Sequence, residues 1–393
     1  MALDMNDART LLRKSLVPAF SAFLLTRILI LIVFLFASGV RFDVPVQELG
    51  DRIQEPVISL RESGLAARLG KKVLNADALW YADIAQHGYE RRAFDANGEH
   101  NWAFFPLFPL VLRFAGKLTG EYGLTGSLLA NIFFLLALVQ LYQLVLKFDY
   151  DAEVARLAVI YLAAFPTSYF FSLPFTESLF LLLSVSCFLA AKNNHWWLAG
   201  LFGGLATATR VTGLCLLPVI LMLFWQQERK VNHKALALLL IPAGIVPYMI
   251  FLHRITGNAL AFLDVQAAWG HSLGFFLRPL WDYLKRPLDI NFRWDFRFLN
   301  FLAALLALGC SAVLVKRRQW ALAAYTLLCV IVPLSAMRLQ SLTRYTMIAF
   351  PIFIVLGEAG KSFYIDQIIR TVFIFALGVM ALLFALHFSM AMS

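Results

Sequence analysis

The chain has 393 residues, of which 61% are hydrophobic and only 15% are charged. Soluble globular proteins carry roughly a quarter charged residues, so this composition excludes a soluble class and indicates a polytopic membrane protein. The formal net charge is +10, but Lys and Arg lie mostly between hydrophobic segments. Membrane topology and anionic membrane lipid explain them, and no nucleic acid is expected as a partner.

Segments that reach or approach the roughly 20 apolar residues of a transmembrane helix recur along the chain. They predict an all-α polytopic membrane protein with about eleven transmembrane helices in a single domain, residues 1–393. The expected spans are residues 17–39, 123–146, 154–171, 174–191, 195–209, 211–226, 235–253, 297–315, 320–337, 344–358 and 370–389. The short segments beside Pro174 and Arg210 could be half-spanning elements that line a polar cavity.

Lys and Arg in the short connections predict the orientation, because cytoplasmic loops are enriched in them. A cytoplasmic N-terminus leaves only Arg210, Arg338 and Arg344 in the short outside connections. This orientation requires that residues 102–118, which contain two prolines, do not cross the membrane. A bacterial or archaeal cytoplasmic membrane is expected, since the chain has no Asn-x-Ser/Thr sequence; in a eukaryote the location would be the endoplasmic reticulum.

Two long stretches, residues 40–122 and 254–296, then lie together on the non-cytoplasmic side. Residues 65–73 place Leu and Val on one helical face and Arg and Lys on another. This pattern predicts an interfacial helix beside lipid phosphates. The second stretch is rich in Trp, Phe and Arg, which is also typical of a membrane interface.

The first of these loops carries the most informative residues of the chain. If residues 77–88 are helical, Asp77, Trp80, Tyr81 and Gly88 share one face. A carboxylate would then lie beside two aromatic rings that could pack against a sugar or an isoprenoid. Asp77 could equally be a helix N-cap, a position for which Asn75 competes.

Other charged residues have both a functional and a structural interpretation. Asp83 and His87 are i, i+4 neighbours, which indicates a local hydrogen-bonded pair more than catalysis. Asp77, Asp83 and His87 do not share one helical face, so neither a metal site nor a cofactor is expected. Arg27 lies near the middle of the first span, where an unpaired charge is costly, and is expected to pair inside the bundle in a structural role.

The segment 77–89, followed by residues 103–109, resembles the signature of the PIG-V family of GT-C glycosyltransferases. That family comprises the second mannosyltransferase of glycosylphosphatidylinositol assembly and its prokaryotic relatives. Further segments that resemble the family are residues 165–178, 206–213, 266–270 and 341–345. The chain departs from the family at Asn75-Ala76, where relatives often carry an aromatic residue, but Asp77 is present.

The resemblance implies a GT-C-type bundle that moves mannose from a polyprenyl-phosphate donor to a hydroxyl of a glycolipid or glycan acceptor. Transfer would invert the anomeric carbon on the non-cytoplasmic face, with Asp77 as the catalytic base. The leaving lipid phosphate needs cations more than an acid, and Lys71 and Lys72 could support the arginines there. The residues expected to bind substrate are Trp80, Tyr81, His87, Tyr89, Phe105, Pro106, Glu177, Arg210, Trp269, His271, Arg344 and Tyr345.

Several alternatives remain open from the sequence. The arginines could anchor helix ends in lipid headgroups, which is the favoured interpretation for Arg338, and Glu177 could cap a helix. Trp269 and His271 could close a cavity or be interfacial anchors. A transporter or lipid flippase would have a similar composition, although the two related halves of many transporters are not seen here. A catalytically silent scaffold subunit is a third possibility.

Overall fold

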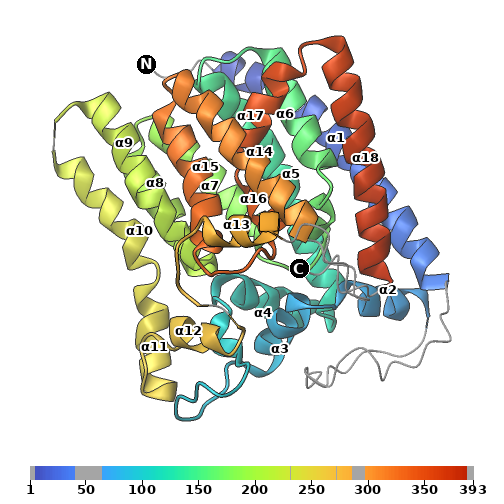
Figure 1. Ribbon diagram of the computed structural model, residues 1–393, viewed down its shortest axis with the longest axis vertical. Helices are drawn as coiled ribbons and strands as arrows, with labels where there is room; N and C mark the ends of the chain where they lie inside the picture. Colours follow the sequence, from blue (N-terminus) through green and yellow to red (C-terminus); the bar gives the residue numbers. More distant parts are fainter. Residues whose placement is uncertain (1–4, 40–63, 231, 271, 286–296, 387–393) are drawn as a thin grey trace.

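The computed structural model describes residues 5–39, 64–230, 232–270, 272–285 and 297–386. All regular structure in these ranges is helical, and the long helices form a bundle (Figure 1). The α-helices are α1 (Met5–Gly39), α2 (Leu65–Val73), α3 (Asp77–His87), α4 (Leu107–Thr119), α5 (Gly123–Lys147), α6 (Ala152–Ala164), α7 (Glu177–Lys192), α8 (Trp196–Thr209), α9 (Leu216–Glu228), α10 (Leu240–Ala243), α11 (Val246–Thr256), α12 (Ala261–Asp264), α13 (Arg278–Lys285), α14 (Arg297–Lys316), α15 (Trp320–Leu334), α16 (Leu342–Ile348), α17 (Pro351–Ala359) and α18 (Phe363–Ala385). The 3-10 helices are η2 (Asn101–Ala103), η3 (Ser168–Ser172), η4 (Val211–Cys215), η5 (His233–Leu239) and η6 (Val265–Ala267).

Helices α5, α7 and α8 form the centre of the bundle, with α5 packed on α7 and α7 packed on α8. Small residues allow very close contacts on the far side of α8. A Cβ atom on Gly244, between α10 and α11, would lie only 2.0 Å from the carbonyl oxygen of Gly204 on α8. Gly at such positions lets helix backbones approach closely, which is common in membrane bundles.

The prediction of eleven transmembrane helices is not confirmed. Six helical segments in the described ranges are long and apolar enough to span a membrane: Leu11–Gly39, Gly123–Lys147, Val211–Glu228, His233–Thr256, Arg297–Lys316 and Phe363–Ala385. A seventh span is possible if α16 and α17, which are bent by 78°, count as one. The other expected spans correspond to α6, α7, α8 and α15, which have 13 to 16 residues. At about 1.5 Å per residue, such helices are shorter than a hydrocarbon core of about 30 Å.

Proline explains why one of the expected spans is interrupted. The segment expected to cross at residues 154–171 ends as α6 at Ala164, just before Pro166. A residue that precedes proline avoids the helical conformation, and Phe165 is accordingly extended, with φ −54° and ψ 141°. The chain then continues through η3 and reaches α7 only at Glu177. Non-helical backbone therefore lies inside the bundle, where it brings polar groups together.

Helices α2, α3, α4, α11 and α12 lie together at one end of the bundle (Figure 1). The helix predicted over residues 65–73 is present as α2. Helix α4 has 13 residues, about 20 Å in length, so it does not cross a membrane by itself. Lys361, in the connection between α17 and α18, forms an ion pair with Asp151, the N-cap of α6. Arg317, directly after α14, pairs with Glu358 near the end of α17.

Candidate active site

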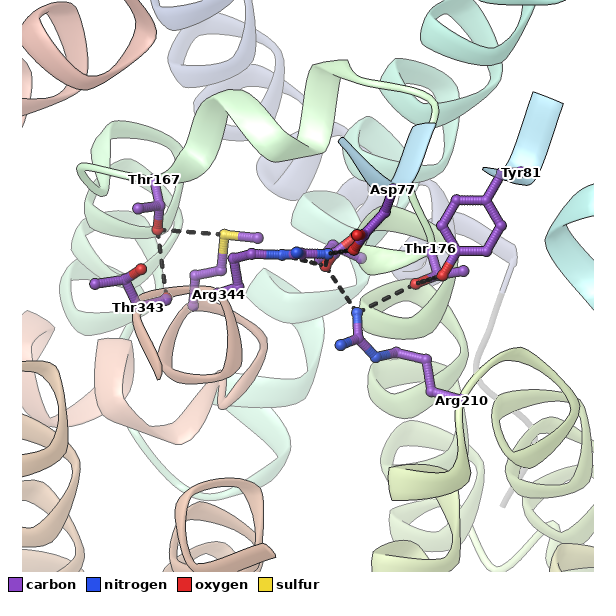
Figure 2. A network of polar contacts seen from close by, with 9 residues as sticks. Asp77, Tyr81, Thr167, Thr176, Arg210, Thr343 and Arg344 are labelled. Carbon is purple, nitrogen blue, oxygen red and sulfur yellow. Dashed lines mark hydrogen bonds and ion pairs between the residues drawn. The ribbon is translucent and has the colours of Figure 1, made fainter. Parts of the chain in front are cut away.

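Four charged side chains from distant parts of the chain meet at one point (Figure 2). Arg344 on α16 donates through Nη2 to Asp77 Oδ2, at 2.8 Å, and to Glu177 Oε1, at 2.7 Å. Its Nε also donates to Glu177 Oε1, at 2.9 Å, and Arg210 Nη1 donates to the same oxygen at 2.7 Å. Charge-assisted hydrogen bonds of this length are strong. Glu177 therefore holds two guanidinium groups next to each other.

Both carboxylates of the cluster begin helices. Asp77 is the first residue of α3 and Glu177 is the first residue of α7. The positive end of a helix dipole stabilises an anion at this position. Asp77 is not the N-cap of α3, because Ala76 occupies the N-cap position. The Asp77 carboxylate is consequently available for other contacts.

Arg210 reaches the cluster from a break between two helices. Its backbone is extended, with φ −153° and ψ 142°, between α8 and η4. Besides Glu177, its Nη1 donates to Thr176 Oγ1 at 3.1 Å, and its guanidinium lies 5.0 Å from the ring centre of Tyr345. Cation–π contact of this kind favours a fixed guanidinium. The Tyr81 hydroxyl lies 3.4 Å from Thr176 Oγ1 and joins the same network.

The four charges differ in their access to solvent. The side chains of Glu177 and Arg344 are 0% and 6% exposed, whereas that of Asp77 is 31% exposed. Two positive and two negative groups cancel, as buried charges must to avoid a large desolvation cost. Asp77 is therefore the carboxylate of the cluster that a second molecule can reach.

Asp77, Arg210 and Arg344 line a cavity of about 370 Å³, within the range of about 300–1,000 Å³ for small-molecule sites. Aromatic rings form one wall. Phe104 lies between Tyr81, whose ring centre is 5.1 Å away, and Trp269, at 5.7 Å. The indole nitrogen of Trp269 is buried and has no hydrogen-bond partner in the described part of the chain.

Most of the residues expected to bind substrate gather here. Those that line the cavity are Tyr81, Phe105, Arg210, Trp269, Arg344 and Tyr345. Glu177 does not line it, but holds the two arginines. Trp80 stands behind the wall, stacked on Phe104 at 5.6 Å. Arg338, for which a headgroup anchor was favoured, also lines the cavity and donates to the carbonyl oxygen of Trp269 at 3.0 Å. His271 lies outside the described residues.

Three of the expected substrate-binding residues lie elsewhere. His87, Tyr89 and Pro106 line a second hollow of about 360 Å³, between α3, α4 and α11. His87 Nδ1 makes the expected local hydrogen bond with Asp83, at 2.8 Å. The Tyr89 hydroxyl donates to the carbonyl oxygen of Phe104 at 2.7 Å, and burial raises the pKa of Tyr89 well above its usual value, so the proton is retained.

Sequence reasoning did not single out several polar residues of the site. Thr176 accepts from Arg210, and the cavity is also lined by Thr209, Thr212, Gln266, Gln340 and Ser341. Thr176 directly precedes Glu177, and Thr209 and Thr212 flank Arg210. Their position beside a charged residue at a helix break could have identified these threonines as site residues, because side chains at such a break share one polar pocket.

Within the described residues, Arg27 has neutral hydrogen-bond partners and no counter-ion. Its Nη1 donates to the carbonyl oxygen of Ser168 at 2.9 Å and to Ser172 Oγ at 3.0 Å, and its Nη2 donates to the Ala163 carbonyl at 3.1 Å. The guanidinium also lies 4.8 Å from the ring centre of Phe134. Arg27 thus supplies donors to the carbonyls that the break between α6 and η3 leaves free, and it does so away from the cavity.

The described ranges contain no group of three or more His, Cys, Asp or Glu side chains placed to hold a metal ion. The chemistry open to the cavity residues is that of a carboxylate near guanidinium groups. Such a set can accept a proton through Asp77 and stabilise an anion through the arginines.

Comparison with known proteins identifies the family. The family model for mannosyltransferase (PIG-V) matches residues 19–240, more than half of the chain. The chain belongs to this family. The resemblance that the sequence motifs indicated is thereby confirmed.

Two mammalian proteins match part of the chain. GPI alpha-1,6-mannosyltransferase 2 of Mus musculus is 31% identical over 176 residues, which cover 41% of this chain and 34% of the mouse protein. The Homo sapiens enzyme of the same name is 30% identical over 169 residues, 39% of this chain and 33% of the human protein. The match thus spans about a third of the length of these relatives.

A solved structure shares the fold. ArnT from Cupriavidus metallidurans, crystallised with undecaprenyl phosphate, superposes with a TM-score of 0.51 at 13% identity, over 94% of this chain and 74% of ArnT. At this identity the likeness describes the fold alone.

Proposed function

We propose that this PIG-V family member is an inverting mannosyltransferase that uses polyprenyl-phosphate mannose. The acceptor is a hydroxyl of a lipid-linked or glycan molecule on the non-cytoplasmic face. The observation that carries the proposal is one cavity lined by a partly exposed carboxylate, Asp77, and two guanidinium groups, Arg210 and Arg344. Membership of a mannosyltransferase family supports mannose as the sugar.

Asp77 is the proposed base. Arg344 occupies Oδ2, whereas Oδ1 accepts no hydrogen bond from a described residue and belongs to a side chain at the cavity surface. Oδ1 would take the proton of the acceptor hydroxyl as its oxygen forms a bond to the anomeric carbon. The bond between that carbon and the lipid phosphate oxygen breaks from the opposite side, so the anomeric configuration inverts. The proton stays on Asp77, and the electron pair leaves with the lipid phosphate.

The arginines are the proposed phosphate ligands. Arg344 Nη1 and Arg210 Nη2 make no hydrogen bond to a described residue, whereas Nε and Nη2 of Arg344 and Nη1 of Arg210 donate to Glu177. A guanidinium fixed in this way can present its free edge to phosphate oxygens without reorganising. The crystallisation of ArnT with undecaprenyl phosphate supports a polyprenyl phosphate as the carrier. Arg338, at the rim, adds a further positive charge.

The sugar would lie between these charges and the aromatic wall. Tyr81, Phe104 and Trp269 offer apolar faces and, in Trp269, a buried indole donor without a partner in the described residues. A hexose presents both apolar ring faces and hydroxyls, so this wall suits it. The non-cytoplasmic orientation rests on the distribution of Lys and Arg, together with the grouping of α2–α4 and α12 at one end of the bundle (Figure 1).

Reconstitution tests the proposal. The purified protein is placed in lipid vesicles with radiolabelled polyprenyl-phosphate mannose and a panel of glycolipid acceptors. Mannosylated product is expected, with an anomeric configuration opposite to that of the donor. Retention of configuration would contradict direct displacement with Asp77 as base. Movement of labelled donor across the vesicle membrane without product would instead indicate a flippase.

A further inference from the structure

The second hollow, which His87, Tyr89 and Pro106 share, carries a charge pattern of its own. Arg91, in the loop after α3, and Arg113, on α4, both line it. Neither arginine forms an ion pair with a described residue, in contrast to nearby Arg92, which pairs with Glu90 at 3.3 Å. No described residue neutralises these two guanidinium groups, so an anion bound in the hollow would be attracted by both.

The floor of the hollow is apolar. Pro109 and Leu110 of α4 and Pro247 and Phe251 of α11 line it. The apolar surface continues outward, because Leu110 is 46% exposed and Phe114, one turn further along α4, is 72% exposed. Ile250 on α11 is exposed as well. In a membrane protein such exposed apolar side chains contact acyl chains.

The hollow combines an exposed apolar surface with two arginines that have no ion pair among the described residues, so it fits an amphipathic anion. We propose that this hollow binds the phosphate headgroup of an anionic membrane lipid. Arg91 and Arg113 would share the phosphate oxygens, a task to which the planar guanidinium is suited. The acyl chains would leave along Leu110 and Phe114.

The hollow is separate from the reaction cavity but shares a wall with it. Phe105 lines the cavity and Pro106 lines the hollow. Tyr89 and Tyr248, on the side of the hollow, donate hydrogen bonds to the Phe104 carbonyl, at 2.7 and 3.1 Å. A lipid bound here therefore lies directly behind the segment that forms the aromatic wall.

Equilibrium binding of fluorescent phosphatidylglycerol to the full-length protein in detergent micelles tests this site. The comparison lipid is phosphatidylcholine with the same acyl chains. Tighter binding of phosphatidylglycerol is expected, and the double variant Arg91→Gln/Arg113→Gln should weaken it roughly tenfold or more. The matched control is Arg229→Gln/Arg318→Gln, which removes two exposed arginines that do not line the hollow and should leave the affinity unchanged.

A variant without any charge change provides a second measure. Leu110→Trp would fill the floor at a partly exposed position and should also abolish binding of phosphatidylglycerol, while the thermal unfolding midpoint stays close to that of the wild type. Equal weakening by both double variants would overturn the proposal, since it would indicate attraction by net charge alone. Inorganic phosphate that competes at concentrations similar to the lipid would overturn it too, because the site would then recognise free phosphate. The assay requires no turnover, so it is independent of the proposed transferase activity.

Discussion

Nη2 of Arg344 donates a hydrogen bond to Asp77 Oδ2 at 2.8 Å, although 267 positions separate the two residues in the sequence. The same nitrogen donates to Glu177 Oε1 at 2.7 Å. Arg344 thus fixes the Asp77 carboxylate, which is the proposed base. The fully buried Glu177 carboxylate in turn fixes Arg344. A phosphate at the free edge of Arg344 would share this guanidinium with Asp77, so the base and the proposed phosphate site are coupled through one side chain.

Replacement of Asp77 by Asn should remove most of the transferase activity. Asn retains an oxygen that can accept from Arg344, so the fold should persist, but it cannot accept the acceptor's proton. Loss of a general base typically costs about 10²- to 10⁴-fold in rate, and kcat for mannose transfer in vesicles measures it. Asp83→Asn is the matched control, because Asp83 bonds only His87 among the described residues and does not line the cavity. Comparable kcat in the two variants would rule out Asp77 as the base.

Replacement of Arg344 by Lys tests whether geometry or charge matters. Lys keeps the positive charge but cannot contact Asp77 and Glu177 through two separate nitrogens, as Arg344 does through Nε and Nη2. A fall in kcat of roughly 100-fold is expected, similar to the loss of one preorganised donor to a developing anion. Arg338→Lys, at the exposed rim, should change kcat much less. If Arg344→Lys retained wild-type kcat, charge alone would suffice.

Much of the site was foreseeable, because it consists of charged residues in hydrophobic surroundings. Asp77, Glu177, Arg210 and Arg344 stand out in a chain with so few charges, and family resemblance grouped them. Their direct contacts were not foreseeable. They depend on helix breaks at Pro166 and at Arg210, and the tertiary packing of the bundle decides where the side chains then meet.

Other features could not be seen in the sequence, for identifiable reasons. Hydrophobicity gave one continuous span over α16 and α17, whereas the structure bends the pair by 78° before Pro351, so they form at most a broken span. Family resemblance placed His87 and Tyr89 among the substrate-binding residues, but they line the second hollow. His87 lies on another face of α3 from Asp77, and Tyr89 follows the turn at Gly88, whose φ is 89°. The pairing of Arg27 was expected, but carbonyl oxygens as its partners could be seen only once the end of α6 was located.

Replacement of Glu177 by Gln should destabilise the protein as well as inactivate it. The side chain is fully buried and its Oε1 accepts three hydrogen bonds from two guanidinium groups. Removal of one member of a buried ion pair typically costs about 3–5 kcal/mol, because the partner charge is left uncompensated. A lower thermal unfolding midpoint in detergent is expected. Glu153→Gln breaks an exposed pair with Arg156, worth about 0–1 kcal/mol, and serves as control; equal midpoints in the two variants would contradict a structural role for Glu177.

Replacement of Arg27 by Met should separate stability from catalysis. Arg27 donates to the main-chain carbonyls of Ala163 and Ser168. The Ala163 carbonyl would keep the Ser168 hydroxyl as a donor, whereas the Ser168 carbonyl would lose the Arg27 donor, and a buried carbonyl without a donor costs about 1–3 kcal/mol. The unfolding midpoint should fall, while KM for donor in the folded fraction stays near the wild-type value, because Arg27 does not line the cavity. A large rise in KM would place Arg27 in substrate binding instead.

The aromatic wall of the cavity depends on two tyrosine hydroxyls. Removal of both should destabilise the protein by more than the sum of the two single removals. Tyr89 donates to the carbonyl oxygen of Phe104, and Tyr248 donates to those of Trp102 and Phe104, at 2.8 and 3.1 Å. In Tyr89→Phe the Phe104 carbonyl keeps Tyr248 as a donor, so a loss of about 1 kcal/mol or less is expected.

The double variant Tyr89→Phe/Tyr248→Phe leaves the Phe104 carbonyl without either hydroxyl. Its loss of stability should exceed the sum of the two single losses by about 0.5–3 kcal/mol, the range for residues within one network. Mannose transfer should fall in parallel, since the wall of the cavity is no longer held in place. Thermal unfolding and kcat of the four proteins in one double-mutant cycle measure both effects, and strict additivity would show that the two hydroxyls support the wall independently.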